Sequence, residues 1–192
     1  MQTERQKEII EAALELITKK GIQGLTMKNI AKKIGITEPA IYRHYDNKIH
    51  ILIAILDFFI SNTEQIFTKE VNNYSKVIDK IEHLFINHFT SFSATPSLVS
   101  VIFSEEIFRN EPMLIEKIFE IIDKNDKILK KIIINGQKNG ELRTDIEAKH
   151  LSTIIMGTLR LFVKKWQFSA YSYNLPKEGK KLFESLKLLI VK

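Results

Sequence analysis

Residues 26–48 decide the fold: Thr26-Met-Lys-Asn-Ile-Ala-Lys-Lys-Ile-Gly-Ile-Thr-Glu-Pro-Ala-Ile-Tyr-Arg-His-Tyr-Asp-Asn-Lys48. Thr26 can begin a helix because its hydroxyl accepts a hydrogen bond from an unpaired backbone N–H. Gly35 ends that helix, since glycine enters the left-handed conformation without steric cost. Thr37 is a second N-cap, and Pro39 follows in the first helical turn, where its missing N–H does no harm. The stretch therefore predicts two short helices joined by a tight turn, a helix-turn-helix.

Basic residues are concentrated around this stretch. Residues 19–48 contain seven basic and two acidic side chains, a net charge of +5, whereas the whole chain of 192 residues carries +6. A solvated helix face explains many charge runs. A run that coincides with a helix-turn-helix favours nucleic-acid binding instead. The second helix is expected from Glu38 to about Tyr45, with Tyr45 in the core.

The composition excludes several classes of protein. Hydrophobic residues make up 44% of the chain, enough for a core in one or two small domains. No cysteine is present, which excludes disulfides, thiolate nucleophiles and cysteine-ligated zinc. No apolar run approaches the ~18–20 residues of a membrane span, and the N-terminus lacks the pattern of a signal peptide. We therefore expect a cytoplasmic protein with no membrane partner.

Helical periodicity accounts for the rest of the chain. Thr3 and Gln6 have capping-box spacing at the start of a first helix, which Gly21 ends. Further helices are expected at about 46–71, 76–93, 97–108, 113–135, 145–168 and 176–191, with breaks at 71–75 and 110–112. Gly136 and Gly140 should bracket a connector, and Asp145 should cap the helix after it. Strand alternation is missing, so the sequence predicts an all-α fold of about nine helices.

The continuous pattern from Gly24 to Lys48 closely resembles the DNA-binding domain of TetR/AcrR-family transcriptional regulators. The segment Ile41-Tyr-Arg-His-Tyr…Lys48 is its most specific part, whereas residues after about 60 are similar only in layout. The resemblance implies a three-helix N-terminal DNA-binding domain, residues 1–47, and a helical-bundle domain for ligand binding and dimerisation, residues 48–192. It also implies a repressor that binds palindromic operator DNA as a homodimer and that a small-molecule effector releases from the DNA. An activator, and a ligand-binding or interaction module without DNA binding, remain alternatives.

The resemblance also predicts which residues bind DNA. A recognition helix enters the major groove with its N-terminal residues near the base edges. The predicted DNA-binding residues are Thr26, Lys28, Thr37, Glu38, Pro39, Ala40, Tyr42, Arg43, His44 and Lys48. Glu38 can accept a hydrogen bond from cytosine N4, whereas its two successors offer apolar contact alone. Base readout is therefore expected to fall largely on Lys28, Thr37 and Arg43.

Phosphate contacts are expected from the positions that usually hold them in the family, Tyr42, His44 and Lys48, with Thr26 joining them. Each residue also has a structural alternative. Tyr42 could be a packed surface aromatic, His44 could cap its own helix, and Lys48 could be a solvated lysine at a helix start.

The last two long helices are the dimer interface that the resemblance implies. Gly157 lies inside the first of them, where it costs roughly 1 kcal/mol of helix propensity, and close helix approach would explain it. The predicted interface residues are Gly157, Leu161, Trp166, Phe183, Leu186 and Ile190. Core packing is an equal alternative for Trp166.

The resemblance implies a ligand cavity in the helical body, between the fourth and eighth helices. The many aromatic and soft residues there agree with an apolar cavity and suggest a hydrophobic effector. The predicted pocket residues are Phe59, Phe85, His88, Phe89, Phe92, Phe103 and Met113. At helical spacing an aromatic stripe is more often core than pocket.

An enzyme is the rival class. Glu147 and His150 have the Glu-x-x-His spacing of a helical metal-ligand pair, but the second pair that a di-iron bundle needs is missing. The sequence also lacks the Gly-x-Ser-x-Gly, His-Glu-x-x-His and phosphate-loop motifs. We therefore predict no catalytic residues, no metal site and no cofactor.

Overall fold

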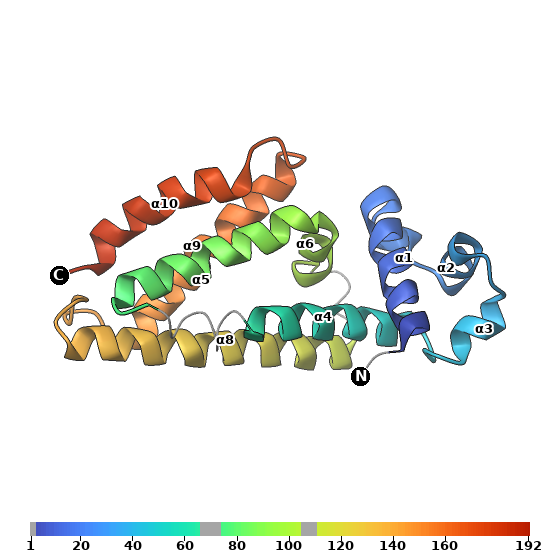
Figure 1. Ribbon diagram of the computed structural model, residues 1–192, viewed down its shortest axis with the longest axis horizontal. Helices are drawn as coiled ribbons and strands as arrows, with labels where there is room; N and C mark the ends of the chain where they lie inside the picture. Colours follow the sequence, from blue (N-terminus) through green and yellow to red (C-terminus); the bar gives the residue numbers. More distant parts are fainter. Residues whose placement is uncertain (1–2, 66–73, 105–110) are drawn as a thin grey trace. The chain divides into compact units, whose positions relative to one another are not determined.

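The computed structural model describes residues 3–65, 74–104 and 111–192. Within these ranges the chain forms nine α-helices, one short 3₁₀ helix and no strand (Figure 1). This confirms the predicted all-α fold of about nine helices. The predicted helix ends at about Val71 and Phe108 lie outside the described residues, as do residues 71–73 of the first predicted break and residue 110 of the second.

The chain divides into two compact units. Unit 1 contains Met1–Ile60 and Pro96–Phe119, and unit 2 contains Ser61–Thr95 and Glu120–Lys192, so that α4 and α8 each contribute to both. The helices are α1 (Glu4–Lys20), η1 (Ile22–Gly24), α2 (Met27–Ile34), α3 (Glu38–Tyr42), α4 (Lys48–Gln65), α5 (Val77–Ala94), α6 (Pro96–Ile102), α8 (Pro112–Lys138), α9 (Ala148–Phe168) and α10 (Leu175–Ile190).

Unit 1 is built on α1, which packs against η1, α2 and α6. The predicted capping box is confirmed: Thr3 Oγ1 accepts from the Gln6 backbone N–H, and Gln6 Oε1 accepts from the Thr3 N–H. Ile17 of α1, Ile30 of α2 and Ile41 of α3 are buried together with other apolar side chains. This small core holds the three N-terminal helices, blue in Figure 1, in one body.

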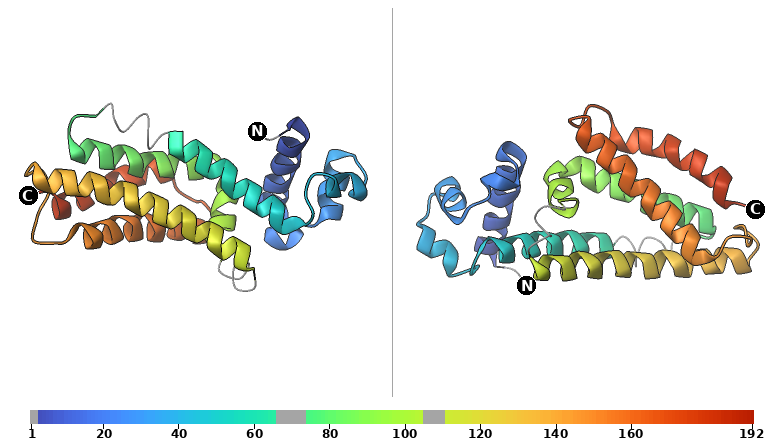
Figure 2. Two further views of the ribbon diagram at one scale, coloured as in Figure 1. Left: turned by 90° about the horizontal axis from the view of Figure 1, so that it is seen from below. Right: turned by 180° about the vertical axis from the view of Figure 1, so that it is seen from behind.

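Unit 2 is organised around α5, along which α10 packs closely, while α9 contacts both helices (Figures 1 and 2). The Phe85 and Phe183 ring centroids lie 5.5 Å apart across the α5–α10 contact. Gly179 of α10 lies directly against Phe89, because a Cβ at this glycine would stand 2.1 Å from Phe89 Cδ2. The missing side chain is what lets α10 approach α5 so closely.

Gly136 does not begin a connector, because α8 continues through it to Lys138. The glycine is buried, and a Cβ there would lie 2.7 Å from Val77 Cγ1 and 2.8 Å from Leu142 Cγ. Close packing rather than a turn therefore explains this glycine. Gly140, with φ +75°, does turn the chain as predicted.

The prediction that Asp145 caps α9 is wrong. The helix begins at Ala148 with Glu147 at the N-cap position and no side-chain cap. The carboxylate of Asp145 is instead bound by the Arg143 guanidinium, with Nε and Nη2 donating over 2.8 and 2.6 Å. Arg143 Nη1 also donates to the Leu189 carbonyl, so this connector fastens the end of α10.

Candidate nucleic-acid interface

The helix-turn-helix forms in unit 1 with the predicted stop signals. Thr26 Oγ1 accepts from the Asn29 backbone N–H at 3.1 Å, which caps α2. Asn29 Nδ2 in turn donates to the Gly24 carbonyl at 2.9 Å. Gly35 ends α2 with φ 73° and ψ 30°, in the left-handed region. Both the cap and the glycine stop are confirmed.

The recognition helix is shorter than predicted, because α3 ends at Tyr42 rather than near Tyr45. Thr37 stands at its N-cap position, but its side chain makes no capping hydrogen bond. The next helix, α4, begins at Lys48, close to its predicted start, and Asn47 caps it. Asn47 Oδ1 accepts from the backbone N–H groups of Ile49 and His50, at 2.8 and 3.1 Å.

All ten predicted DNA-binding residues lie at the surface of unit 1. Seven are exposed, and three are half-buried, namely Glu38, Ala40 and His44. Tyr42 is 47% exposed, so its ring and hydroxyl are open to a partner. The arrangement therefore leaves every one of these side chains accessible to a ligand.

Glu15 of α1 forms ion pairs with two of the basic residues of this region. Its Oε2 lies 2.6 Å from Lys33 Nζ and 3.8 Å from Lys19 Nζ. The hydrogen bond from Lys33, supported by its charge, holds the pKa of the Glu15 carboxyl below its usual value. The sequence alone did not reveal the Lys33 contact, which joins residues 18 apart.

The other five basic residues between 19 and 48 have no carboxylate partner in the described part of the chain. They are Lys20, Lys28, Lys32, Arg43 and Lys48. Their positive charge is therefore uncompensated locally, as a surface that binds phosphate requires. Lys20 and Lys32 were not among the predicted contacts.

Tyr45 is buried at 7% exposure within unit 1, as expected for a core residue. Its hydroxyl has no hydrogen-bond partner in the described residues. Burial raises the pKa of this phenol, so it stays neutral.

A small cavity of about 20 Å³ lies inside unit 2. The α5 wall is formed by Ile81, Leu84, Phe85 and His88, the α8 wall by Leu129, and the α9 wall by Ile155, Met156 and Leu159. Of the seven predicted pocket residues, Phe85 and His88 thus line this cavity. Phe89 and Phe92 are buried elsewhere in unit 2, whereas Phe59, Phe103 and the exposed Met113 belong to unit 1.

His88 is the polar side chain of this cavity. Its Nδ1–H donates to the Leu84 carbonyl over 2.9 Å. Burial lowers the pKa of the imidazole, against the opposing effect of that hydrogen bond, so the neutral ring is favoured.

The predicted interface residues divide into two groups. Gly157 and Leu161 are exposed on α9, whereas Trp166, Phe183, Leu186 and Ile190 are buried within unit 2. Burial inside one chain assigns these four to the core, because α9 and α10 need them to pack against α5. Sequence reasoning missed the apolar side chains that these two helices do expose, chiefly Ile154, Phe168, Leu188 and Leu189.

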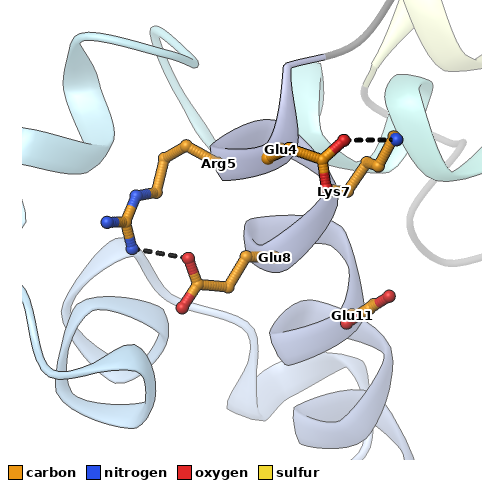
Figure 3. Close-up of a pocket in the computed structure, with 5 residues that line it drawn as sticks. All are labelled: Glu4, Arg5, Lys7, Glu8 and Glu11. Carbon is orange, nitrogen blue, oxygen red and sulfur yellow. Dashed lines mark hydrogen bonds and ion pairs between the residues drawn. The ribbon is translucent and has the colours of Figure 1, made fainter.

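A hollow on the outer face of α1 is lined by charged residues alone, Glu4, Arg5, Lys7, Glu8 and Glu11. Figure 3 shows Arg5 paired with Glu8 and Lys7 with Glu4 along the helix. Such pairs are typical of a solvated helix surface. Among the described residues, no group of three or more potential metal ligands gathers, and no helix is long and apolar enough to cross a membrane.

Two family models cover the chain. Residues 9–55 match the model described as "Bacterial regulatory proteins, tetR family", and residues 56–191 match "YsiA-like protein, C-terminal region". The fatty acid metabolism regulator protein of Bacillus subtilis (strain 168) is 24% identical over 168 residues, which are 88% of this chain and 86% of that protein. The class D tetracycline repressor protein of Escherichia coli is 47% identical, but over 47 residues, 24% of this chain and 22% of the repressor.

Solved structures share the fold. The fatty acid degradation regulator FadR from Bacillus halodurans matches with a TM-score of 0.87 at 22% identity, covering 97% of this chain and 96% of its own. The transcriptional regulator FadR from Bacillus subtilis, solved in complex with stearoyl-CoA, matches with a TM-score of 0.83 at 24% identity, covering 94% of this chain and 96% of its own.

Proposed function

Since this chain belongs to the TetR family of bacterial regulatory proteins, we propose that it represses transcription by binding palindromic operator DNA as a homodimer. A small-molecule effector releases it from the DNA. Residues 1–47 bind the operator, and residues 48–192 bind the effector and the second copy. The protein acts in the cytoplasm.

The uncompensated charge of the helix-turn-helix carries this proposal. Glu15 pairs with Lys33 and Lys19, whereas Lys28, Arg43 and Lys48 have no carboxylate partner among the residues described. A protein surface attracts the phosphate backbone through such charges, which release counterions from the duplex on binding. These cations lie on the motif whose geometry fits a major groove.

Roles within this surface follow from side-chain chemistry. Lys28 and Arg43 donate hydrogen bonds and suit guanine O6 and N7, whereas Glu38 accepts and suits cytosine N4. Tyr42, His44 and Lys48 hold phosphates and fix the register of the protein on the duplex.

The second copy binds to the exposed apolar faces of α9 and α10. Leu161, Phe168 and Leu188 are 64%, 79% and 83% exposed, although such side chains are rarely left so open in clusters. A standard interface buries about 800 Å² per partner, an area that two long helices can provide. A twofold dimer then places two recognition helices on half-sites about one DNA turn apart.

The effector is an apolar molecule, and a long-chain acyl compound is the first to test. The support comes from the relatives, one a fatty acid metabolism regulator and another solved with stearoyl-CoA. The cavity in unit 2 is lined almost wholly by carbon. Release requires that the effector bind the DNA-competent arrangement of the dimer less tightly than the other arrangement.

Fluorescence anisotropy with a labelled duplex at several salt concentrations tests the DNA-binding part. Tyr42→Ala combined with Lys48→Ala should weaken binding by about tenfold or more, and should flatten the dependence of log affinity on log salt by about 0.9 for each phosphate that the variant no longer neutralises. Lys19→Gln is the matched control, because it removes one charge that Glu15 already partly compensates.

Unchanged affinity in the double variant would reject the assignment of these residues to the phosphates. No binding by the native protein even at low salt would instead favour a ligand-binding or interaction module. A reporter gene placed behind a bound operator distinguishes a repressor from an activator by the sign of its response.

A further inference from the structure

The middle of α9 forms one wall of the cavity of unit 2. Ile155 and Leu159 belong to the cavity wall. Successive helical residues are about 100° apart, so Gly157 and Leu161 point to the opposite side. Both are exposed, and a Cβ at Gly157 would meet no atom of the chain within 4 Å. One segment of helix is thus cavity wall on its inner side and accessible surface on its outer side.

Polar contacts fasten α9 near both of its ends. The buried Ser152 donates from Oγ to Asp126 Oδ1 of α8 over 2.6 Å. At the other end Trp166, also buried, donates from Nε1 to the Tyr173 carbonyl over 2.8 Å. The segment that covers the cavity lies between these two fixed points.

The wall of the cavity that α5 forms is packed on its other side against α10. Phe85 of α5 lies against Phe183 of α10, and Phe89 of α5 lies against Gly179 with no space to spare. The cavity itself holds about one water-sized sphere and is apolar. A larger occupant that stays within the cavity must therefore displace a wall. The outer side of α9 has room for such a movement, because a Cβ at Gly157 would meet no atom of this chain within 4 Å.

We infer that the cavity beneath α9 takes a small apolar molecule, or the hydrocarbon segment of a larger effector, and that its occupancy changes the affinity of one copy for another. The inference rests on the proposed function, since it places the dimer contact on the outer side of α9. An occupant pushes the middle of the helix outward at Gly157, where the second copy meets bare backbone. By linkage, dimerisation changes the affinity for the occupant by the same factor.

A cavity-enlarging variant with a defined probe tests this inference. Leu159→Ala removes part of the α9 wall, and benzene is the probe because it fills apolar cavities of this kind. Benzene should raise the thermal midpoint of Leu159→Ala and should shift its dimer dissociation constant, measured by sedimentation equilibrium, by at least about fivefold. Val77→Ala is the control, because it removes a buried group of α5 that contacts Gly136 and lies outside the cavity lining. Benzene should leave its dimer constant unchanged.

A raised midpoint with a dimer constant that stays within about twofold would overturn the coupling. No rise in the midpoint would overturn the cavity as a binding site. If Leu159→Ala does not fold, Met156→Phe fills the space from the edge of the wall and should shift the dimer constant without benzene; an unchanged constant there rejects the inference equally. Fluorescence anisotropy on the same samples distinguishes the two proposals. Absence of DNA binding by the native protein contradicts the proposed function. Intact DNA binding with an unchanged dimer dissociation constant contradicts this inference alone.

Discussion

At the scale of single residues, Glu15 determines which lysines of unit 1 have an ion-pair partner. It holds Lys33 and Lys19 on the side of α1, while Lys28 and Lys48 stay without an ion-pair partner among the residues described. The net charge of residues 19–48 is therefore larger than the positive charge that is available to bind DNA phosphates. Two of the seven basic residues share the single negative charge of Glu15 within the folded unit.

Tyr45→Phe should stabilise the protein. The hydroxyl of Tyr45 is buried with no partner among the described residues, and an unsatisfied buried polar group costs about 1–3 kcal/mol. We expect the free energy of unfolding in urea to rise by about 1 kcal/mol. Tyr42→Phe, at an exposed site, is the control and should change it by less than about 0.5 kcal/mol. A decrease in stability in Tyr45→Phe would show that the hydroxyl is satisfied, for example by water.

His88 should make unit 2 sensitive to acid. Burial lowers the pKa of His88 in the folded state. Below a pH equal to the ordinary value of 6.5, the unfolded chain therefore binds a proton at His88 more readily than the folded chain does. The free energy of unfolding should therefore fall as pH drops below about 6.5, by at most about 1.4 kcal/mol per pH unit for this group. His88→Gln should flatten the dependence between about pH 5 and 7, and the exposed His150→Gln should not. Parallel curves for native protein and His88→Gln would contradict the assignment.

At the scale of helices, the sequence predicted the local signals well. The capping box at Thr3, the cap at Thr26 and the stop at Gly35 depend on residues within one helical turn, and all three are confirmed. Gly136 was misassigned because its reason is a contact with Val77, which is far away in the chain. Asp145 was misassigned because Arg143 takes its carboxylate. The sequence does not show such tertiary competition.

Gly179→Ala should weaken the contact of α10 with α5. A methyl group there would stand 2.1 Å from the Phe89 ring, and overpacking a core costs roughly 1–3 kcal/mol. Thermal or urea unfolding should show the destabilisation. Gly157→Ala is the matched control, another helical glycine but with open space around it, and it should keep or slightly raise the stability of the monomer. Equal stability of both variants would mean that α10 can shift without penalty.

At the scale of the molecule, the family and the class of the fold were evident from residues 24–48, whereas the binding surfaces of the body were not. The spacing of Trp166, Phe183 and Leu186 predicted an apolar face, but it did not distinguish the face that packs inside unit 2 from the face left exposed. Both faces of these helices carry large apolar residues. Which of them is available for binding depends on exposure, and exposure depends on the whole fold.

Leu161→Glu should separate the dimer into monomers and reduce operator affinity. A carboxylate would be buried without a partner in the proposed interface, and one recognition helix reads too few base pairs to bind tightly alone. Sedimentation velocity and anisotropy measure the two effects together. Ile122→Glu is the control, because it places the same charge at a comparably exposed apolar site on α8. A dimer that survives Leu161→Glu would move the interface elsewhere.

The double role of α9 has a consequence for organisms that carry several related regulators. Ile155 and Leu159 line the cavity, whereas Gly157 and Leu161 are exposed on the other side of the same helix, so a substitution that refits the cavity also acts on the proposed dimer contact. A change of effector would then bring a change of preferred mate, and a duplicated copy would stop pairing with its parent as it acquired a new signal. We expect insulation between sister regulators to arise as a by-product of effector divergence, without separate selection against mixed pairs.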